Sequence, residues 1–197
     1  MFLEAAVLGV VIGLVRKGSI RNISVTKIRG WILALIAFVL QISTLIFRDV
    51  SFVESYGRYF YIASSILIIL TLVFNLDKKG MWIILTGSIL NFIVVIMNGN
   101  KMPISFDGLE LAGLQNMIDG IKSGEITNYM SIEQVTNWTK HLGKYIVMPK
   151  PYPMAKVISI GDVFMSLGII LFVQGQMIKP YLVTKSRMVS VGYRGRI

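Results

Sequence analysis

The sequence contains no cysteine and only one histidine, His141. Without cysteine, disulfide bonds, thiolate metal ligands and cysteine nucleophiles are excluded. A lone histidine also argues against a histidine-based metal site and against a Ser-His catalytic triad. We therefore predict that the protein holds no metal ion and no cofactor.

Charged residues are scarce as well. They make up 15% of the 197 residues, whereas 54% are apolar and the mean hydropathy is +0.69. Soluble domains have about 25% charged residues. The apolar residues collect in blocks of roughly 17–22 residues, the length that lets a helix cross ~30 Å of hydrocarbon. This pattern is typical of a multi-pass membrane protein.

The apolar blocks predict an all-α fold, a single membrane domain over residues 1–197 with about five transmembrane helices. The predicted spans cover about 2–15, 31–47, 60–75, 81–97 and 157–178. The first is only ~21 Å long at 1.5 Å per residue, so whether it crosses completely stays open. Gly9 and Gly13 within it form a small-xxx-small step that would let another helix approach closely.

The distribution of positive charge predicts the orientation. The net charge is +10, and the Lys and Arg residues concentrate between Arg16 and Arg29 and in a tail over residues 179–197. By the positive-inside rule both segments are cytoplasmic and the N-terminus is outside. Both should contact anionic lipid headgroups. Nucleic acid is not an expected partner, because no basic recognition helix is present.

The same orientation makes the long polar region 98–156 an extracytoplasmic cap. Apolar residues from Leu109 to Ile121 recur at helical spacing, interrupted by Gly113 and Gly120. A weaker helical pattern covers about 131–145. We therefore predict a small cap built of short helices.

Asp162 lies near the start of the fifth span, in Ser159-Ile160-Gly161-Asp162. A carboxylate inside a span costs about 2.5–3.5 kcal/mol, so it needs a partner or a wet cavity. Two interpretations stay open. Asp162 either accepts backbone N–H bonds at the helix start or belongs to a functional site.

Other polar residues fall at the same predicted membrane face. Asn98 and Asn100 end the fourth span, although Asn-Gly is first of all a turn signal. Asn91 is expected to hydrogen-bond between helices. The predicted binding residues are Glu4, Asn98, Asn100, His141 and Asp162. Asp107, Glu110 and Lys144 in the cap are positioned to close over them.

Three stretches resemble an uncharacterised bacterial membrane family known as a domain of unknown function. These are Asn98-Gly99-Asn100-Lys101-Met102-Pro103, Thr139-Lys140-His141-Leu142-Gly143-Lys144 and Ser159-Ile160-Gly161-Asp162. The resemblance covers nearly the whole chain and implies a bacterial cytoplasmic membrane protein. Asn100 and Lys144 stand where the resemblance implies Gly and Asp, which weakens any chemistry that needs two carboxylates.

The stretch from Gly161 to Leu171 is also similar to the segment of lipoprotein signal peptidases that holds one of their two catalytic aspartates. Those enzymes activate water with a carboxylate pair. At the place implied for the second acid this chain has Pro103, so only Asp107 or Glu110 is a candidate partner for Asp162.

The leading hypothesis is a non-enzymatic membrane protein that binds a lipid, a peptide or another envelope protein at its outer face. An aspartyl-type intramembrane peptidase is the alternative. A small-solute transporter is the second alternative, and it is weaker because no inverted repeat is visible.

Overall fold

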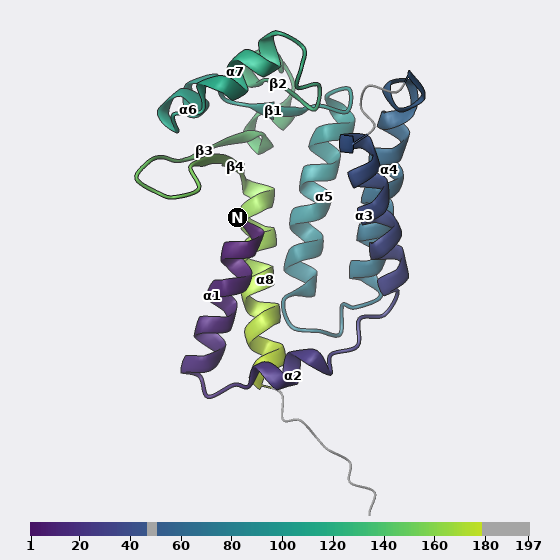
Figure 1. The fold of residues 1–197 in the computed structure, drawn as a ribbon, viewed down its shortest axis with the longest axis vertical. Coiled ribbons are helices and arrows are strands. Elements are labelled where there is room, and N and C mark those ends of the chain that lie inside the picture. Colours follow the sequence, from purple (N-terminus) through teal and green to yellow (C-terminus); the bar gives the residue numbers. More distant parts are fainter. Residues whose placement is uncertain (47–50, 179–197) are drawn as a thin grey trace, which may run out of the picture.

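The computed structural model describes residues 1–46 and 51–178, of which about two thirds are helical. Five long helices lie side by side (Figure 1). A small domain over residues 102–159, which we call the cap, lies over one end of them. The long helices are α1 (Phe2–Val15), α3 (Trp31–Ile46), α4 (Ser51–Val73), α5 (Met81–Met97) and α8 (Ile160–Ile178). The short helix α2 (Ile20–Ser24) lies at the opposite end.

Each long helix overlaps one of the predicted apolar spans. α1 and α5 have the predicted bounds, whereas α4 begins nine residues before the predicted start at residue 60. Phe47 and the basic tail 179–197 lie outside the described residues. Two helices, with windows Tyr56–Val73 and Ile160–Ile178, are long and apolar enough to cross a membrane, and α1, α3 and α5 are shorter apolar helices.

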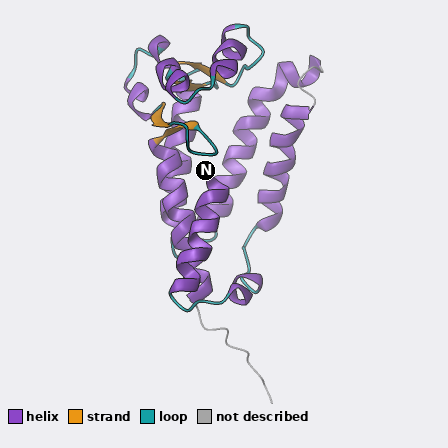
Figure 2. Cartoon of the chain, turned by 60° about the vertical axis from the view of Figure 1, so that its left-hand side comes forward, coloured by secondary structure: helices purple, strands orange, loops and turns teal. Residues whose placement is uncertain are grey.

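The prediction of an all-α fold is wrong, because the cap contains a four-stranded mixed sheet (Figure 2). Its strand order is β2-β1-β3-β4, with β1 parallel to both neighbours and β3 antiparallel to β4. The strands are β1 (Met102–Ile104), β2 (Tyr129–Ser131), β3 (Lys144–Met148) and β4 (Lys156–Ser159). β4 runs directly into α8, so α8 starts three residues later than predicted.

The helix predicted over 131–145 is also wrong. This segment holds two short 3₁₀ helices, η1 (Ile132–Gln134) and η2 (Trp138–Leu142), and then enters β3. A side chain caps the start of each turn: the Ser131 hydroxyl accepts from the Glu133 N–H, and the Asn137 side chain accepts from the Thr139 N–H. Such side-chain bonds to nearby backbone compete with a continuous helix.

The predicted helical pattern from Leu109 to Ile121 does form helices. They are α6 (Phe106–Leu111) and α7 (Gln115–Lys122), separated near Gly113, whose φ is +70°. Their apolar sides pack on the sheet and make the core of the cap. Its buried members are Ile104, Leu109, Ala112, Ile118 and Val157.

Close helix packing depends on glycine. A Cβ on Gly87 of α5 would overlap the carbonyl oxygen of Gly161 in α8, so the two backbones touch. On the other side of α8, a Cβ on Gly9 of α1 would lie 2.9 Å from the Cβ of Val173. Small residues permit this approach, as expected for Gly9 in the first span.

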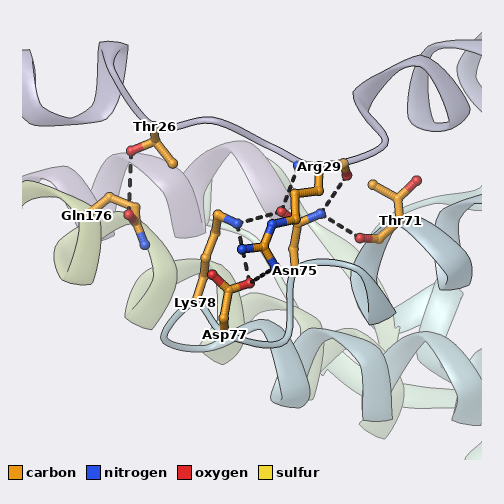
Figure 3. Close-up of polar contacts among 7 residues, drawn as sticks. All are labelled: Thr26, Arg29, Thr71, Asn75, Asp77, Lys78 and Gln176. Atoms are coloured by element: carbon orange, nitrogen blue, oxygen red, sulfur yellow. Dashed lines mark hydrogen bonds and ion pairs between the residues drawn. The ribbon is translucent and has the colours of Figure 1, made fainter.

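The end opposite the cap is fastened by Asn75, which is completely buried (Figure 3). Its Nδ2 donates to the carbonyls of Arg29 and Thr71, both at 2.7 Å. Its Oδ1 accepts from the Arg29 N–H at 2.9 Å and from Lys78 Nζ at 2.6 Å. Asn75 thereby joins the segment before α3 to the turn between α4 and α5.

Candidate functional site

Asp162 lies in the first turn of α8, where that helix leaves the sheet, and is only 7% exposed. Its backbone N–H donates to the Ser159 hydroxyl at 3.0 Å, and its Oδ2 accepts from the Ser159 N–H at 3.2 Å. This reciprocal pair has the form of a capping box. The structure therefore gives Asp162 the helix-start contact that the sequence left open.

The same carboxylate has two further partners. Lys144 Nζ, from β3 of the cap, lies 2.7 Å from Oδ2, and Asn91 Nδ2, from α5, donates to Oδ1 at 2.9 Å. The Ser159 hydroxyl in turn donates to Asn91 Oδ1 at 2.8 Å. Asp162 thus joins the cap, α5 and α8 in one closed network, and both of its oxygens are occupied.

A second ion pair connects the cap to α1. Lys156 Nζ on β4 donates to Glu4 Oε1 at 2.6 Å. Burial disfavours the ammonium form of Lys156. The hydrogen bonds and charge of Glu4 outweigh that effect, so the pKa of Lys156 is raised above its ordinary 10.5. Lys156 therefore stays cationic at neutral pH.

The remaining predicted binding residues do not join Asp162. Asn98 Nδ2 donates to the Val94 carbonyl and to the buried hydroxyl of Thr139 at 2.8 Å, so it ties the end of α5 to η2. Asn100 lies in the following turn with φ +69°, and His141 is exposed on η2. Among the described residues no hydrogen bond or ion pair connects these three side chains to Asp162.

Asp107 and Glu110, the candidate catalytic partners, are exposed on α6. Within residues 1–46 and 51–178, no hydrogen bond joins either of them to Asp162. The nearest charged group to the Asp162 carboxylate is the ammonium of Lys144 instead. The arrangement is an ion pair, which lacks the second carboxylate that an aspartyl dyad requires.

A cavity of about 360 Å³ lies beside both ion pairs, between the cap and the first residues of α1 and α8. Its polar lining comes from Lys144, Lys156 and Asp162. Its wall is otherwise mostly apolar. The apolar side chains are Met1, Phe2, Ile104, Leu109, Leu114, Met117, Ala155, Val157 and Ile158, with Tyr129 beside them. An apolar pocket with a few convergent polar groups is the usual form of a small-ligand site.

Sequence comparison places this architecture in a family. The family of unknown function DUF5317 matches residues 25–174, which include α3 to α5, the cap and most of α8. The chain belongs to the DUF5317 family. An uncharacterized protein of Thermotoga maritima is 26% identical over 155 residues, which cover 79% of this chain and 80% of that protein. No solved structure matches.

For this DUF5317 protein the sequence identified Asp162, Glu4 and Lys144 as members of one region, but it did not single out Lys156. The available signal was position: Lys156 directly precedes the apolar stretch that re-enters the long helices. Long basic side chains commonly stand at such boundaries, so this signal alone does not distinguish a ligand-binding lysine from an ordinary flanking one.

Proposed function

We propose that this chain is a multi-pass membrane protein that binds an amphiphile with an anionic headgroup in the cavity beneath its cap. The exposed side chains of α3 support membrane insertion. Trp31, Ile32, Phe38 and Val39 are each more than half exposed. A continuous apolar face of this kind is stable against lipid but rare on soluble monomers. We take all five long helices as spans, with α1, α3 and α5 as short ones.

We further propose that the cap is extracytoplasmic. The helix ends opposite the cap carry a cluster of cations, including Arg16, Lys17, Lys27, Arg29 and Lys79. Asp77 is the acidic residue beside them. This excess of positive charge favours a cytoplasmic location for that end of the helices. It also favours contact of these cations with anionic lipid headgroups. The N-terminus of α1, which lies next to the cap, is then outside.

The cavity is the observation that carries the binding proposal. The ammonium groups of Lys144 and Lys156 line it, each paired with one carboxylate, that of Asp162 or Glu4. Each ammonium has three N–H donors, and its carboxylate partner does not use all of them. Lys144 and Lys156 therefore retain donors for a phosphate or carboxylate, while the apolar wall suits the adjoining hydrocarbon.

The state of Asp162 favours binding over catalysis. Its two oxygens already accept three hydrogen bonds, one of them from a cation, and no carboxyl group of the described residues is hydrogen-bonded to it to share a proton. An aspartyl peptidase would need that second carboxyl group. Nothing comparable favours the transporter hypothesis.

Binding can be tested on the purified protein in a neutral detergent, by native mass spectrometry with lysophosphatidylglycerol as the probe. We expect Ala155→Phe, which replaces a small lining residue with a large one and so fills the cavity, to abolish retention of the probe. Lys156→Gln should weaken it about tenfold, the usual cost of losing one charge-assisted hydrogen bond. Lys140→Gln, an exposed lysine of η2, is the matched control. Equal binding by all four proteins would refute the proposed site.

Orientation can be tested separately, because the chain lacks cysteine. Thr127 in the cap and Ser19 near the opposite end are exposed, and neither side chain hydrogen-bonds to a described residue. Each is replaced by cysteine in a separate variant. Intact cells are then treated with a membrane-impermeant maleimide. Labelling at residue 127 but not at residue 19 is expected, and the reverse pattern would place the cap in the cytoplasm.

A further inference from the structure

A second hollow lies away from the cavity, between the cap-side ends of α4 and α5. It has a volume of about 280 Å³ and is lined by Arg58, Tyr59, Ile62, Ile96, Gly99 and Asn100. We call it the α4–α5 groove. The two isoleucines form an apolar floor along the helices, whereas the arginine and the asparagine stand at its polar end. The groove therefore has the two-part character of an amphiphile site.

Arg58 is held at the mouth of the groove by its neighbour. Its Nη2 donates to the Tyr59 hydroxyl at 3.2 Å, and its Cζ lies 5.1 Å from the centroid of the Tyr59 ring. Neither contact neutralises the guanidinium, and no carboxylate whose side chain the structure describes, which leaves residues 47–55 and 179–197 aside, forms an ion pair with it. A guanidinium fixed in this way offers paired donors to a phosphate.

Asn100 supplies the complementary group. Its φ of +69° and the hydrogen bond from its N–H to the Val95 carbonyl at 2.8 Å fix it in the turn after α5. Its Oδ1 is buried and accepts no hydrogen bond in the protein. A buried acceptor without a donor costs free energy, and a ligand that brings an N–H or O–H removes that cost once the Asn100 side chain turns its Oδ1 into the groove.

We infer that the α4–α5 groove binds a phospholipid of the outer leaflet whose headgroup carries a hydrogen-bond donor, such as ethanolamine or glycerol. The phosphate contacts Arg58, the headgroup donor reaches Asn100, and an acyl chain lies against Ile62 and Ile96. A choline headgroup has no N–H or O–H, so it leaves the Asn100 oxygen unsatisfied. The groove thereby distinguishes phospholipids by a donor at the end of the headgroup.

This inference rests on the proposed membrane insertion but not on the cavity beneath the cap, which shares no lining residue with the groove. A free phosphate fits the Arg58 end alone. The apolar floor and the position of the groove at a predicted membrane face favour the whole lipid as occupant.

The test compares dioleoyl phosphatidylethanolamine, phosphatidylglycerol and phosphatidylcholine, each titrated into delipidated protein and measured by native mass spectrometry. We expect the first two to bind about tenfold more tightly than phosphatidylcholine, as one satisfied buried acceptor implies. Asn100→Gly should abolish this preference without changing phosphatidylcholine binding, and glycine suits the positive φ. Asn100→Asp, which keeps an acceptor, should retain the preference. Arg58→Gln should weaken all three lipids alike.

Equal affinity of the wild-type protein for the three lipids would overturn the inference, and so would an unchanged preference in Asn100→Gly. Displacement of the bound lipid by millimolar glycerol 3-phosphate would assign the groove to a soluble phosphate instead. If Asn100→Gly failed to fold, Ile96→Trp would block the groove from its floor and should remove the selective binding. Failure of the membrane proposal differs from all these results, because no lipid would then be retained.

Discussion

The ion pair between Lys144 and Asp162 should stabilise the fold mainly by joining the cap to α8. The two groups are 2.7 Å apart, with side-chain exposures of 19% and 9%. Asp162→Asn removes the charge and turns one oxygen into a donor. Because Asn91 Nδ2 and the Ser159 N–H both point at the carboxylate, the new amide group must face at least one other donor. A cation and a buried N–H are then left poorly satisfied.

Removing one partner of a buried pair costs about 3–5 kcal/mol, and the partial exposure of Lys144 favours the lower end. Lys144→Met should cost less, about 1.5–3 kcal/mol, because the carboxylate keeps its bonds to Asn91 and Ser159. The double variant should be only slightly less stable than Asp162→Asn alone. The coupling energy of the double-mutant cycle is therefore expected to exceed ~1 kcal/mol.

The assay is unfolding by sodium dodecyl sulfate in mixed micelles, followed by far-UV circular dichroism. Glu110→Gln, an exposed acid in the same cap, serves as control and should stay within about 0.5 kcal/mol of the wild type. If the two single changes added without coupling, the 2.7 Å contact would contribute nothing to stability, and the reasoning would be wrong.

Two further changes test the packing of the helices. Gly161→Val should cost about 3 kcal/mol or more in the same unfolding assay, since its Cβ would overlap the Asn91 side chain, whereas Gly57→Ala, with open space around it, should be neutral or stabilising. Asn75→Leu should leave the Arg29 backbone and Lys78 without hydrogen-bond partners and cost about 3 kcal/mol or more. This variant should lose the monodisperse peak in size-exclusion chromatography. Asn116→Leu, on the exposed side of α7, should keep that peak.

The bounds of α1 and α5 were predictable because each of these helices coincides with an apolar run that polar or glycine residues delimit, whereas the start of α4, nine residues before the predicted one, was not. α1 stops before Arg16 and Lys17, and α5 starts after Gly80 and stops at Asn98. Within such an apolar run, a helix satisfies every backbone hydrogen bond inside the segment itself. No long-range information is needed to place such a helix.

The sheet could not be predicted by the same reasoning. β1 has three residues, one of which is Pro103, and proline usually argues against a strand inside a sheet. The strand survives because its flanking N–H groups carry the bonds: Met102 donates to the Asn128 carbonyl and Ser105 to the Lys144 carbonyl. Both acceptors come from segments far along the chain. Such pairing is decided by tertiary contact, which local periodicity does not reveal.

The site shows the same division. A helix-start role was one of the two interpretations that the sequence left open for Asp162, and it was recognisable because Ser159 is three residues away and the capping pattern is local. Its cationic partner, Lys144, lies 18 residues earlier on strand β3, where the sequence pattern predicted a helix. A carboxylate within an apolar segment, such as Asp162, therefore indicates the region of the site. It does not indicate Lys144 and Lys156, the residues whose N–H donors are not all used. Asp162 is satisfied by the fold, whereas Lys144 and Lys156 line the cavity with donors to spare. Under the proposed function, the lysines contact the ligand and the aspartate positions Lys144.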